Sequence, residues 1–191
     1  MRSFDSLTEK EILALAISQE EEDAHIYDDF ADGLKENYPV QAEKFAQMRR
    51  EEDGHRHRLI ELYRSRFGEH IPLIRRQDVR GFVRRKPVWL VRPLGLQAVQ
   101  KAAEVMELET KRFYEVAARR SGDAGIRQLL GDLAEEERHH ARTAEQIAQT
   151  KLRKPRHRDT KKLLGSVVGE SEPVVTIEQH HGHRQSTHQL A

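Results

Sequence analysis

Four stretches of this chain repeat apolar residues with the spacing of an α-helix, and each is bounded by residues that begin or end helices. The first follows Ser6-Leu7-Thr8-Glu9, a capping box, and ends at Asn37-Tyr38. The second covers about 39–67 and ends at Gly68, the third covers about 94–121, and the fourth covers about 124–151. The pattern predicts four long helices in an all-α domain.

The segment between the second and third helices, about 69–93, contains three prolines and has no helical pattern. Helices of this length are roughly 40 Å long, at 1.5 Å per residue. Two hairpins with short turns can be joined in parallel only by a connection that runs the length of the bundle. We therefore expect a ferritin-like four-helix bundle, with two helical hairpins, one long crossover and a domain covering 1–152.

The remaining residues, 153–191, change to basic composition and then to Gly, Ser, Thr and His. We expect a disordered tail, or a linker toward a possible membrane domain. The longest apolar stretches, 12–17 and 88–91, are too short to span a bilayer, and residues 1–5 lack the apolar core of a signal peptide. The chain as given is expected to be soluble.

The composition restricts the chemistry further. The chain has no Cys, which excludes disulfides, Cys-ligated zinc and iron–sulfur centres, so any metal must be held by oxygen and nitrogen. The net charge is +1, but 75–92 and 151–164 each carry seven Lys/Arg and one Asp, leaving 19 basic against 30 acidic residues elsewhere. An acidic body suits divalent cations, whereas the basic segments suit the phosphates of lipid or nucleic acid. Nucleic-acid binding is disfavoured because neither segment interleaves aromatic residues in a way that suggests base stacking, and ordinary solvated helix faces are the alternative interpretation of the charge runs.

One motif occurs twice. A glutamate is followed by a tyrosine seven residues later, and about thirty residues after the glutamate comes Glu-x-x-His. The acidic and histidine residues of the two copies lie on the helical seams, by which we mean the line of core-facing positions along each helix. These six residues are Glu20, Glu52, His55, Glu107, Glu137 and His140. A glutamate-rich surface run could place one glutamate on a seam by chance. Chance does not explain four glutamates in one layer of the bundle, two of which are followed by a histidine three residues later. Since buried carboxylates are costly by several kcal/mol unless paired, the motif predicts a metal site.

The repeated Glu-x6-Tyr and Glu-x-x-His pattern resembles the rubrerythrin branch of the ferritin-like di-iron proteins over about 6–150. The resemblance implies two iron ions per chain, with manganese as the alternative. It implies that Glu52 and Glu137 bridge the ions, while Glu20 with His55 and Glu107 with His140 complete the two sites. Tyr27 and Tyr114 would hold carboxylates in place, or else be plain core aromatics.

The chain also departs from that pattern. Rubrerythrins usually end in a Cys-rich rubredoxin domain, whereas this chain has no Cys, and Thr110 stands where the family tends to have an extra glutamate. Glu104, one turn before Glu107, and Asp23, one turn after Glu20, are candidates for an additional ligand or for an acidic entrance. The chain is similar, more specifically, to the erythrin-type domain that precedes a vacuolar-iron-transporter-like membrane domain in bacterial membrane-bound ferritins.

This resemblance implies a domain that binds Fe²⁺ and oxidises it with O₂ or H₂O₂. It would serve iron export or detoxification as the cytoplasmic part of a membrane iron transporter, at the cytoplasmic face of the inner membrane. The alternatives are a non-catalytic module that senses or captures iron, and a free-standing rubrerythrin-like peroxidase. The sequence leaves the metal, the oxidant and the choice between turnover and sensing open.

Two expectations concern surfaces. Ile12, Leu15 and Ile17 lie off the seam of the first helix, which predicts an exposed apolar surface that a homodimer would cover. The basic residues of 151–164 directly follow the last helix and should attract anionic lipid, at roughly 1 kcal/mol each.

Overall fold

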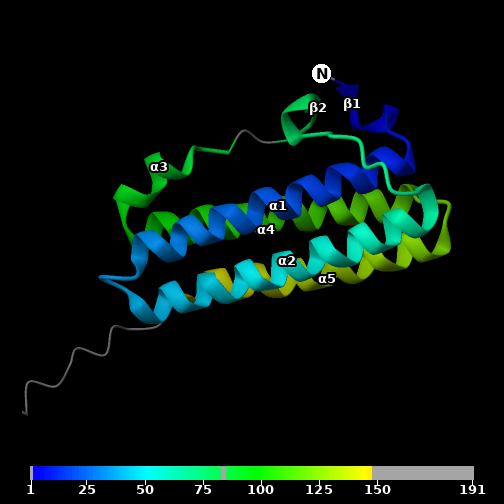
Figure 1. Ribbon diagram of the computed structural model, residues 1–191. Helices are drawn as coiled ribbons and strands as arrows, with labels where there is room; N and C mark the ends of the chain where they lie inside the picture. The colour runs from blue at the N-terminus through cyan, green and yellow to red at the C-terminus, as the bar shows by residue number, and fades with distance from the viewer. Residues whose placement is uncertain (1, 83–84, 148–191) are drawn as a thin grey trace, which may run out of the picture. The chain divides into compact units, whose positions relative to one another are not determined.

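The computed structural model describes residues 2–82 and 85–147. Within that part, four long helices lie side by side: α1 (Glu9–Leu34), α2 (Pro39–Phe67), α4 (Leu96–Arg120) and α5 (Ala124–Ile147). The closest packing is within the hairpins α1–α2 and α4–α5 (Figure 1). The predicted all-α, ferritin-like bundle is confirmed. The predicted tail, 153–191, lies outside the described residues.

The start of α1 differs from the expected capping box. The N-cap is Thr8, not Ser6: the hydroxyl of Thr8 accepts a hydrogen bond from Glu11 N at 3.3 Å, and Glu11 Oε2 accepts one from Thr8 N at 3.0 Å. Ser6 instead ends a short 3-10 helix, η1 (Phe4–Ser6). Glu9 is engaged elsewhere, because its carboxylate accepts from Ser121 Oγ and from Gly122 N in the turn between α4 and α5, each at 2.6 Å.

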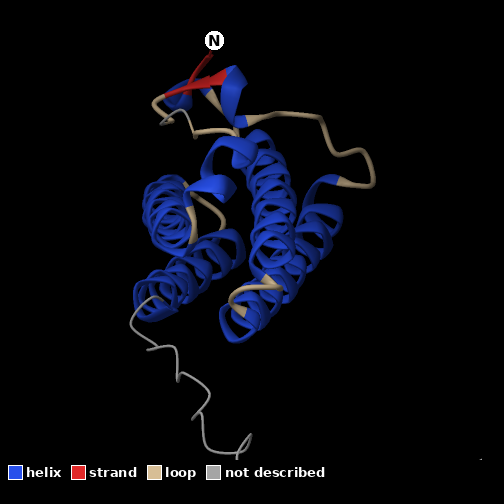
Figure 2. Cartoon of the chain, turned by 90° about the vertical axis from the view of Figure 1, so that its left-hand side faces the viewer, coloured by secondary structure: helices blue, strands red, loops and turns tan. Residues whose placement is uncertain are grey.

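The crossover is more structured than the sequence indicates. It contains η2 (Arg76–Asp78), β2 (Val79–Arg80), α3 (Val88–Val91) and η3 (Arg92–Leu94). Strand β2 pairs in parallel with β1 (Arg2–Ser3), with Arg2 opposite Val79 and Ser3 opposite Arg80. Figure 2, in which the long helices are seen nearly along their axes, shows this pair to one side of the bundle, at the top of the view. The N-terminus is thereby attached to the crossover.

The crossover also covers the face of α1 that we expected to be exposed. Ile12, Leu15 and Ile17 are 3%, 0% and 7% exposed, and they share one core cluster with Ile74 and Val79 of the crossover. The expectation of an apolar surface at these residues is therefore wrong. The homodimer stays a prediction, without this reason for it.

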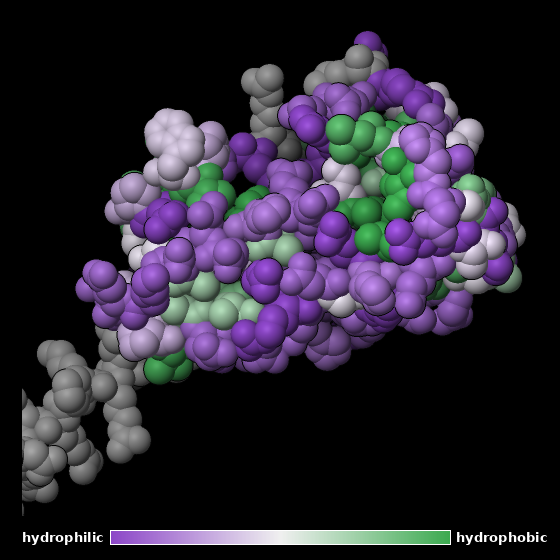
Figure 3. All heavy atoms as spheres, in the orientation of Figure 1, coloured by the Kyte–Doolittle hydropathy of each residue, from purple (hydrophilic) through white to green (hydrophobic). Residues whose placement is uncertain are grey.

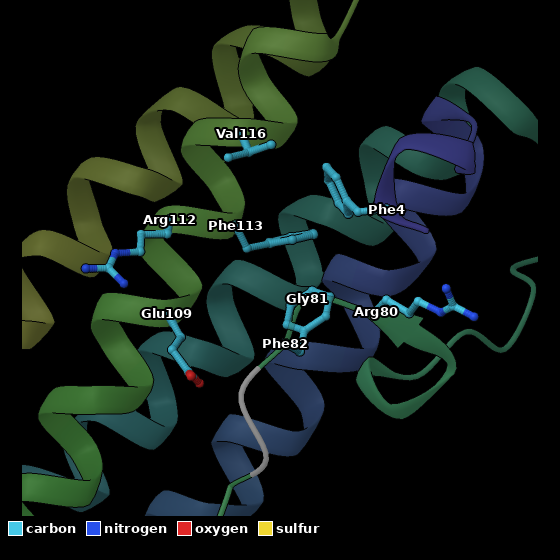
Figure 4. A pocket seen from close by; sticks show the side chains of 8 residues that line it. All are labelled: Phe4, Arg80, Gly81, Phe82, Glu109, Arg112, Phe113 and Val116. Atoms are coloured by element: carbon cyan, nitrogen blue, oxygen red, sulfur yellow. The ribbon is translucent and has the colours of Figure 1, made fainter. Parts of the chain in front are cut away.

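Aromatic side chains attach the N-terminal segment and the crossover to α4. Phe113 lies between Phe4 and Phe82, with ring centroids 5.8 and 5.9 Å away (Figure 4). The three rings line a cavity of about 220 Å³ together with Glu109 and Arg112. No described helix combines the length and apolar character needed to cross a membrane.

Candidate metal centre

The four long helices bring the six predicted residues together at the middle of the bundle. Helix α1 contributes Glu20 and α4 contributes Glu107, while α2 and α5 each contribute a glutamate and a histidine one turn apart. All six are buried, with exposures from 0% for Glu20 to 6% for His140. They separate two apolar clusters, one toward each end of the bundle.

The six residues form two overlapping groups. One contains Glu20, Glu52, His55 and Glu137, and the other contains Glu107 and His140 with the same Glu52 and Glu137. Within each group the potential ligand atoms lie within 4.8 Å of one another. Two metal positions that share a pair of carboxylates therefore fit this geometry.

The histidines show why two glutamates are shared. His55 Nδ1 lies 3.2 Å from Glu52 Oε2 and 3.1 Å from Glu137 Oε1. His140 Nδ1 lies 3.1 Å from Glu52 Oε1 and 3.7 Å from Glu137 Oε2. The two oxygens of each glutamate thus face different imidazoles, whose rings are stacked with centroids 5.3 Å apart. This is the arrangement expected of bridging carboxylates.

Two buried tyrosines fix the other two carboxylates. The Tyr114 hydroxyl donates a hydrogen bond to Glu20 Oε1, and the Tyr27 hydroxyl donates one to Glu107 Oε1. Each tyrosine reaches across to the other hairpin, and each leaves Oε2 of its partner facing a histidine. Burial, followed by the nearby carboxylates, raises the pKa of both phenols well above the ordinary value. Both therefore remain hydrogen-bond donors.

A second pair of glutamates faces the outer nitrogens of the histidines. His55 Nε2 lies 3.0 Å from Glu136 Oε2, and His140 Nε2 lies 2.8 Å from Glu51 Oε2. The sequence analysis missed both residues. The signal was present, because the glutamate of each Glu-x-x-His motif is preceded by another glutamate, so that the repeat reads Glu-Glu-x-x-His.

These outer carboxylates are themselves held in place. Arg58 donates two hydrogen bonds to Glu136, at 2.9 and 2.7 Å, and Gln47 Nε2 donates one to Glu51 at 2.9 Å. Partial burial acts to raise the pKa of Glu136, but Arg58 and His55 hold it below the usual range. Glu136 is therefore a carboxylate at neutral pH.

Protons compensate the buried charges when no cation does. Burial, followed by the charge of Glu52, raises the pKa of Glu20 to about 7, and burial raises that of Glu137 well above its ordinary value. Burial alone would lower the pKa of His55, but the adjacent carboxylates of Glu137, Glu20 and Glu52 raise it to about 12. The site therefore favours positive charge.

The donor atoms fit a pair of iron ions. Oε1 of Glu52, Oε1 of Glu137 and Nδ1 of His140 are buried, and the 3.1 Å contacts that they make with one another or with His55 Nδ1 lack the geometry of a hydrogen bond. Such atoms are costly to bury unless something else engages them. Four carboxylates would balance two divalent cations, and a set of oxygen and imidazole donors suits iron or manganese.

Asp23 and Glu104 lie outside both groups. Asp23 is buried, forms an ion pair with Arg85 of the crossover and accepts a hydrogen bond from Thr110 Oγ1 at 3.1 Å. Glu104 is partly exposed and pairs with Lys101 at 3.0 Å. The entrance suggested at Asp23 is thus occupied by a guanidinium group.

Comparisons with known proteins agree with this architecture. A hypothetical protein from Pyrococcus furiosus is 20% identical, with a TM-score of 0.58 over 76% of this chain and 94% of that one. An uncharacterized conserved protein from Magnetospirillum magnetotacticum MS-1 is 23% identical, with a TM-score of 0.57 over 75% of this chain and 95% of that one. Both share the fold. No curated protein matches the chain.

The family comparison covers the whole site. The rubrerythrin family model matches residues 11–148, a range that includes all six residues of the two groups. On this match, and with the helical bundle and its buried glutamates and histidines, the chain belongs to the rubrerythrin family.

Proposed function

We propose that this domain binds two Fe²⁺ ions and oxidises them with O₂ or H₂O₂. The observation that carries the proposal is the pair of overlapping buried groups, which share Glu52 and Glu137. Glu20 and His55 would complete one position, and Glu107 and His140 the other. Manganese, which accepts the same donors, is the alternative metal.

A pair of positions suits this reaction better than a single one. Two ferrous ions supply one electron each, which matches the two-electron reduction of H₂O₂ to water or of O₂ to H₂O₂. The protein residues provide charge and geometry. The histidines present Nδ1 to the centre, and Tyr114 and Tyr27 orient the carboxylates of Glu20 and Glu107. Burial of all six residues restricts access of bulk water.

Anaerobic titration followed by rapid mixing with oxidant tests the proposal. We expect two Fe²⁺ ions per chain and an increase in visible absorbance when O₂ or H₂O₂ is added. Glu104→Ala, which removes a carboxylate outside both groups, should behave as the parent chain does. Binding of one ion or none, or equal behaviour of Glu104→Ala and a variant lacking Glu20 and Glu107, contradicts the assignment. Repeated turnover supports an enzyme, including a free-standing peroxidase, whereas one slow oxidation supports a capture or sensing module.

We also propose a place for this activity in the cell: iron export or detoxification at the cytoplasmic face of the inner membrane, coupled to a membrane transporter domain. The support is the resemblance described above and the basic composition of 151–164. Co-sedimentation with anionic liposomes should be weaker for a chain ending at residue 150 than for the full chain. Equal binding of both chains contradicts this role of the segment. Light scattering tests the proposed homodimer, and a 24-chain mass would contradict it.

A further inference from the structure

Exposed apolar side chains gather around α3 and the first half of α4. The described residues include seven large apolar side chains that are exposed, and five of them belong to this region: Trp89, Leu90, Leu94, Val105 and Leu108. Trp89 and Leu94 are each 70% exposed. Green atoms reach the surface beside α3 in Figure 3, among hydrophilic ones. Isolated exposed apolar residues are ordinary, but a cluster of them marks a contact surface. We call these five residues the α3–α4 surface.

A hollow continues this surface into the molecule. A cavity of about 370 Å³ lies between α1, α3 and α4, and its lining is mostly apolar. Leu94 and Val105 belong both to the α3–α4 surface and to this lining, and Val88 and Val91 line it from the inner side of α3. The apolar surface is therefore continuous across the short helix and the long one.

Basic side chains accompany the apolar ones. Lys86 and Lys101 line the same cavity, and Arg92 directly follows α3. Arg92 pairs with Asp29 at 3.5 Å and Lys101 with Glu104 at 3.0 Å, both at exposed or partly exposed positions where such pairs contribute little. Lys86 has no ion-pair partner among the described residues. Glu109 also lines the cavity, so the positive charge that this surface offers an anionic partner without compensation from the described residues is that of Lys86.

This combination of residues favours lipid over protein as the partner that binds the α3–α4 surface. Tryptophan is enriched at the interface between water and membrane, where its ring sits at the level of the headgroups. Lysine can lay its methylene chain along apolar material while its ammonium group stays in water, and each basic residue near anionic lipid is attracted to it. The buried centre of a protein–protein contact is instead depleted of lysine. Helix α3 lies between Pro87 and Pro93, and its Trp89 and Leu90 point outward.

We propose that the α3–α4 surface docks on an anionic lipid bilayer, with Trp89 and Leu90 entering the headgroup region. The inference does not depend on the proposed iron chemistry, because none of the residues in this surface belongs to the two metal groups. It is also separate from any lipid contact of 151–164. The acidic metal centre would then be held at a membrane surface by the side of the bundle that carries the crossover.

Trp89 gives a direct test, because it is the only tryptophan of the chain and its emission reports this surface alone. The full chain is mixed with phosphatidylcholine vesicles, with and without phosphatidylglycerol, in the absence of added metal. With phosphatidylglycerol we expect a blue shift of the emission, quenching by brominated acyl chains, and loss of both at high salt. Vesicles of phosphatidylcholine alone should leave the emission unchanged.

A matched pair of lysine substitutions locates the contact. Lys86→Gln removes one charge beside the surface and should weaken vesicle binding about fivefold. Lys10→Gln removes one charge near the N-terminus of α1, far from α3, and should bind as the parent chain does. Helical circular dichroism verifies that both variants fold.

Three outcomes would overturn the proposal. The first is co-sedimentation with anionic vesicles without any change in Trp89 emission, which assigns the contact to another segment. The second is equal binding of the Lys86→Gln and Lys10→Gln variants. The third is a blue shift that follows protein concentration without vesicles, which assigns the surface to a second copy of the chain.

Discussion

Replacing Glu136 with glutamine keeps the size of the side chain but removes the charge that faces the outer nitrogen of His55. Glu136 Oε2 lies 3.0 Å from His55 Nε2 and is held by two hydrogen bonds from Arg58. A carboxylate at this position keeps the proton on Nε2, leaves the lone pair of Nδ1 free for a cation and makes the imidazole a stronger donor. Glutamine provides a weaker acceptor for the same proton.

The expected effect is a loss of metal affinity at one of the two positions. Outer partners of this kind contribute 10–100-fold to affinity, which corresponds to about 1.4–2.7 kcal/mol. The side chain of Glu136 is 41% exposed and that of Arg58 is 40% exposed, so solvent screens the interaction. We therefore expect the lower end of the range, about tenfold.

The repeat supplies a second, symmetry-related test. Glu51 lies 2.8 Å from His140 Nε2 and is 40% exposed, so Glu51→Gln should weaken the other position by a similar factor. Glu135→Gln is the control, because Glu135 is next to Glu136 in the sequence but pairs with Arg138 on the surface. The Glu135→Gln substitution should change the metal affinity by no more than about twofold.

Anaerobic calorimetry with Fe²⁺ measures these affinities directly. The parent chain should show two binding events. Glu136→Gln should weaken one of them about tenfold and leave the other nearly unchanged, and Glu51→Gln should do the reverse. Unchanged affinities in both variants, or an equal loss in Glu135→Gln, would refute the role assigned to the outer carboxylates.

Two further predictions concern the buried groups. Replacing Glu20 and Glu107 together with Ala should abolish iron oxidation and leave the helical circular dichroism intact, because removing buried carboxylates also removes their repulsion; oxidation at the parent rate would show that the ligand assignment is wrong. The metal-free chain should lose stability as pH rises from 5 to 9. The folded pKa of Glu20, about 7 against 4.5, and that of His55, about 12 against 6.5, both exceed the ordinary values, so the folded state holds more protons over this range. Urea unfolding in the presence of a chelator measures how the free energy of unfolding changes with pH, and a rise in stability with pH would contradict the prediction.

The sequence predicted the centre because helical periodicity locates it. Glu52 and His55 occupy core positions between Met48 and Leu59, and the structure buries all four. The outer glutamates were missed for the same reason. Glu51 and Glu136 fall one position off the seam, so periodicity assigns them to solvent, although each reaches back to a histidine.

The features that periodicity could not supply depend on contacts between distant residues. Ser6–Glu9 and Thr8–Glu11 both fit a capping box, and the choice depends on Glu9 bonding to the turn near Ser121. Burial of Ile12 depends on a crossover that has no helical repeat. The two-residue strands β1 and β2 are too short to show any alternation.

The two sides of the centre differ in whether their carboxylates are paired with guanidinium groups from the crossover, and this difference allows two roles of the outer carboxylates to be separated. On the α1–α4 side, Arg85 and Thr110 close over Asp23, so an approaching cation meets a guanidinium group. On the α2–α5 side it meets Glu51 and Glu136, which are partly exposed. If these groups only hold the histidines, their substitution should raise the dissociation rate of the metal. If they also attract it, the association rate should fall and its dependence on salt should weaken, because long-range attraction acts on encounter. Stopped-flow association at low and high salt distinguishes the two, and an association rate that is unchanged in Glu51→Gln and Glu136→Gln would limit both residues to holding the histidines.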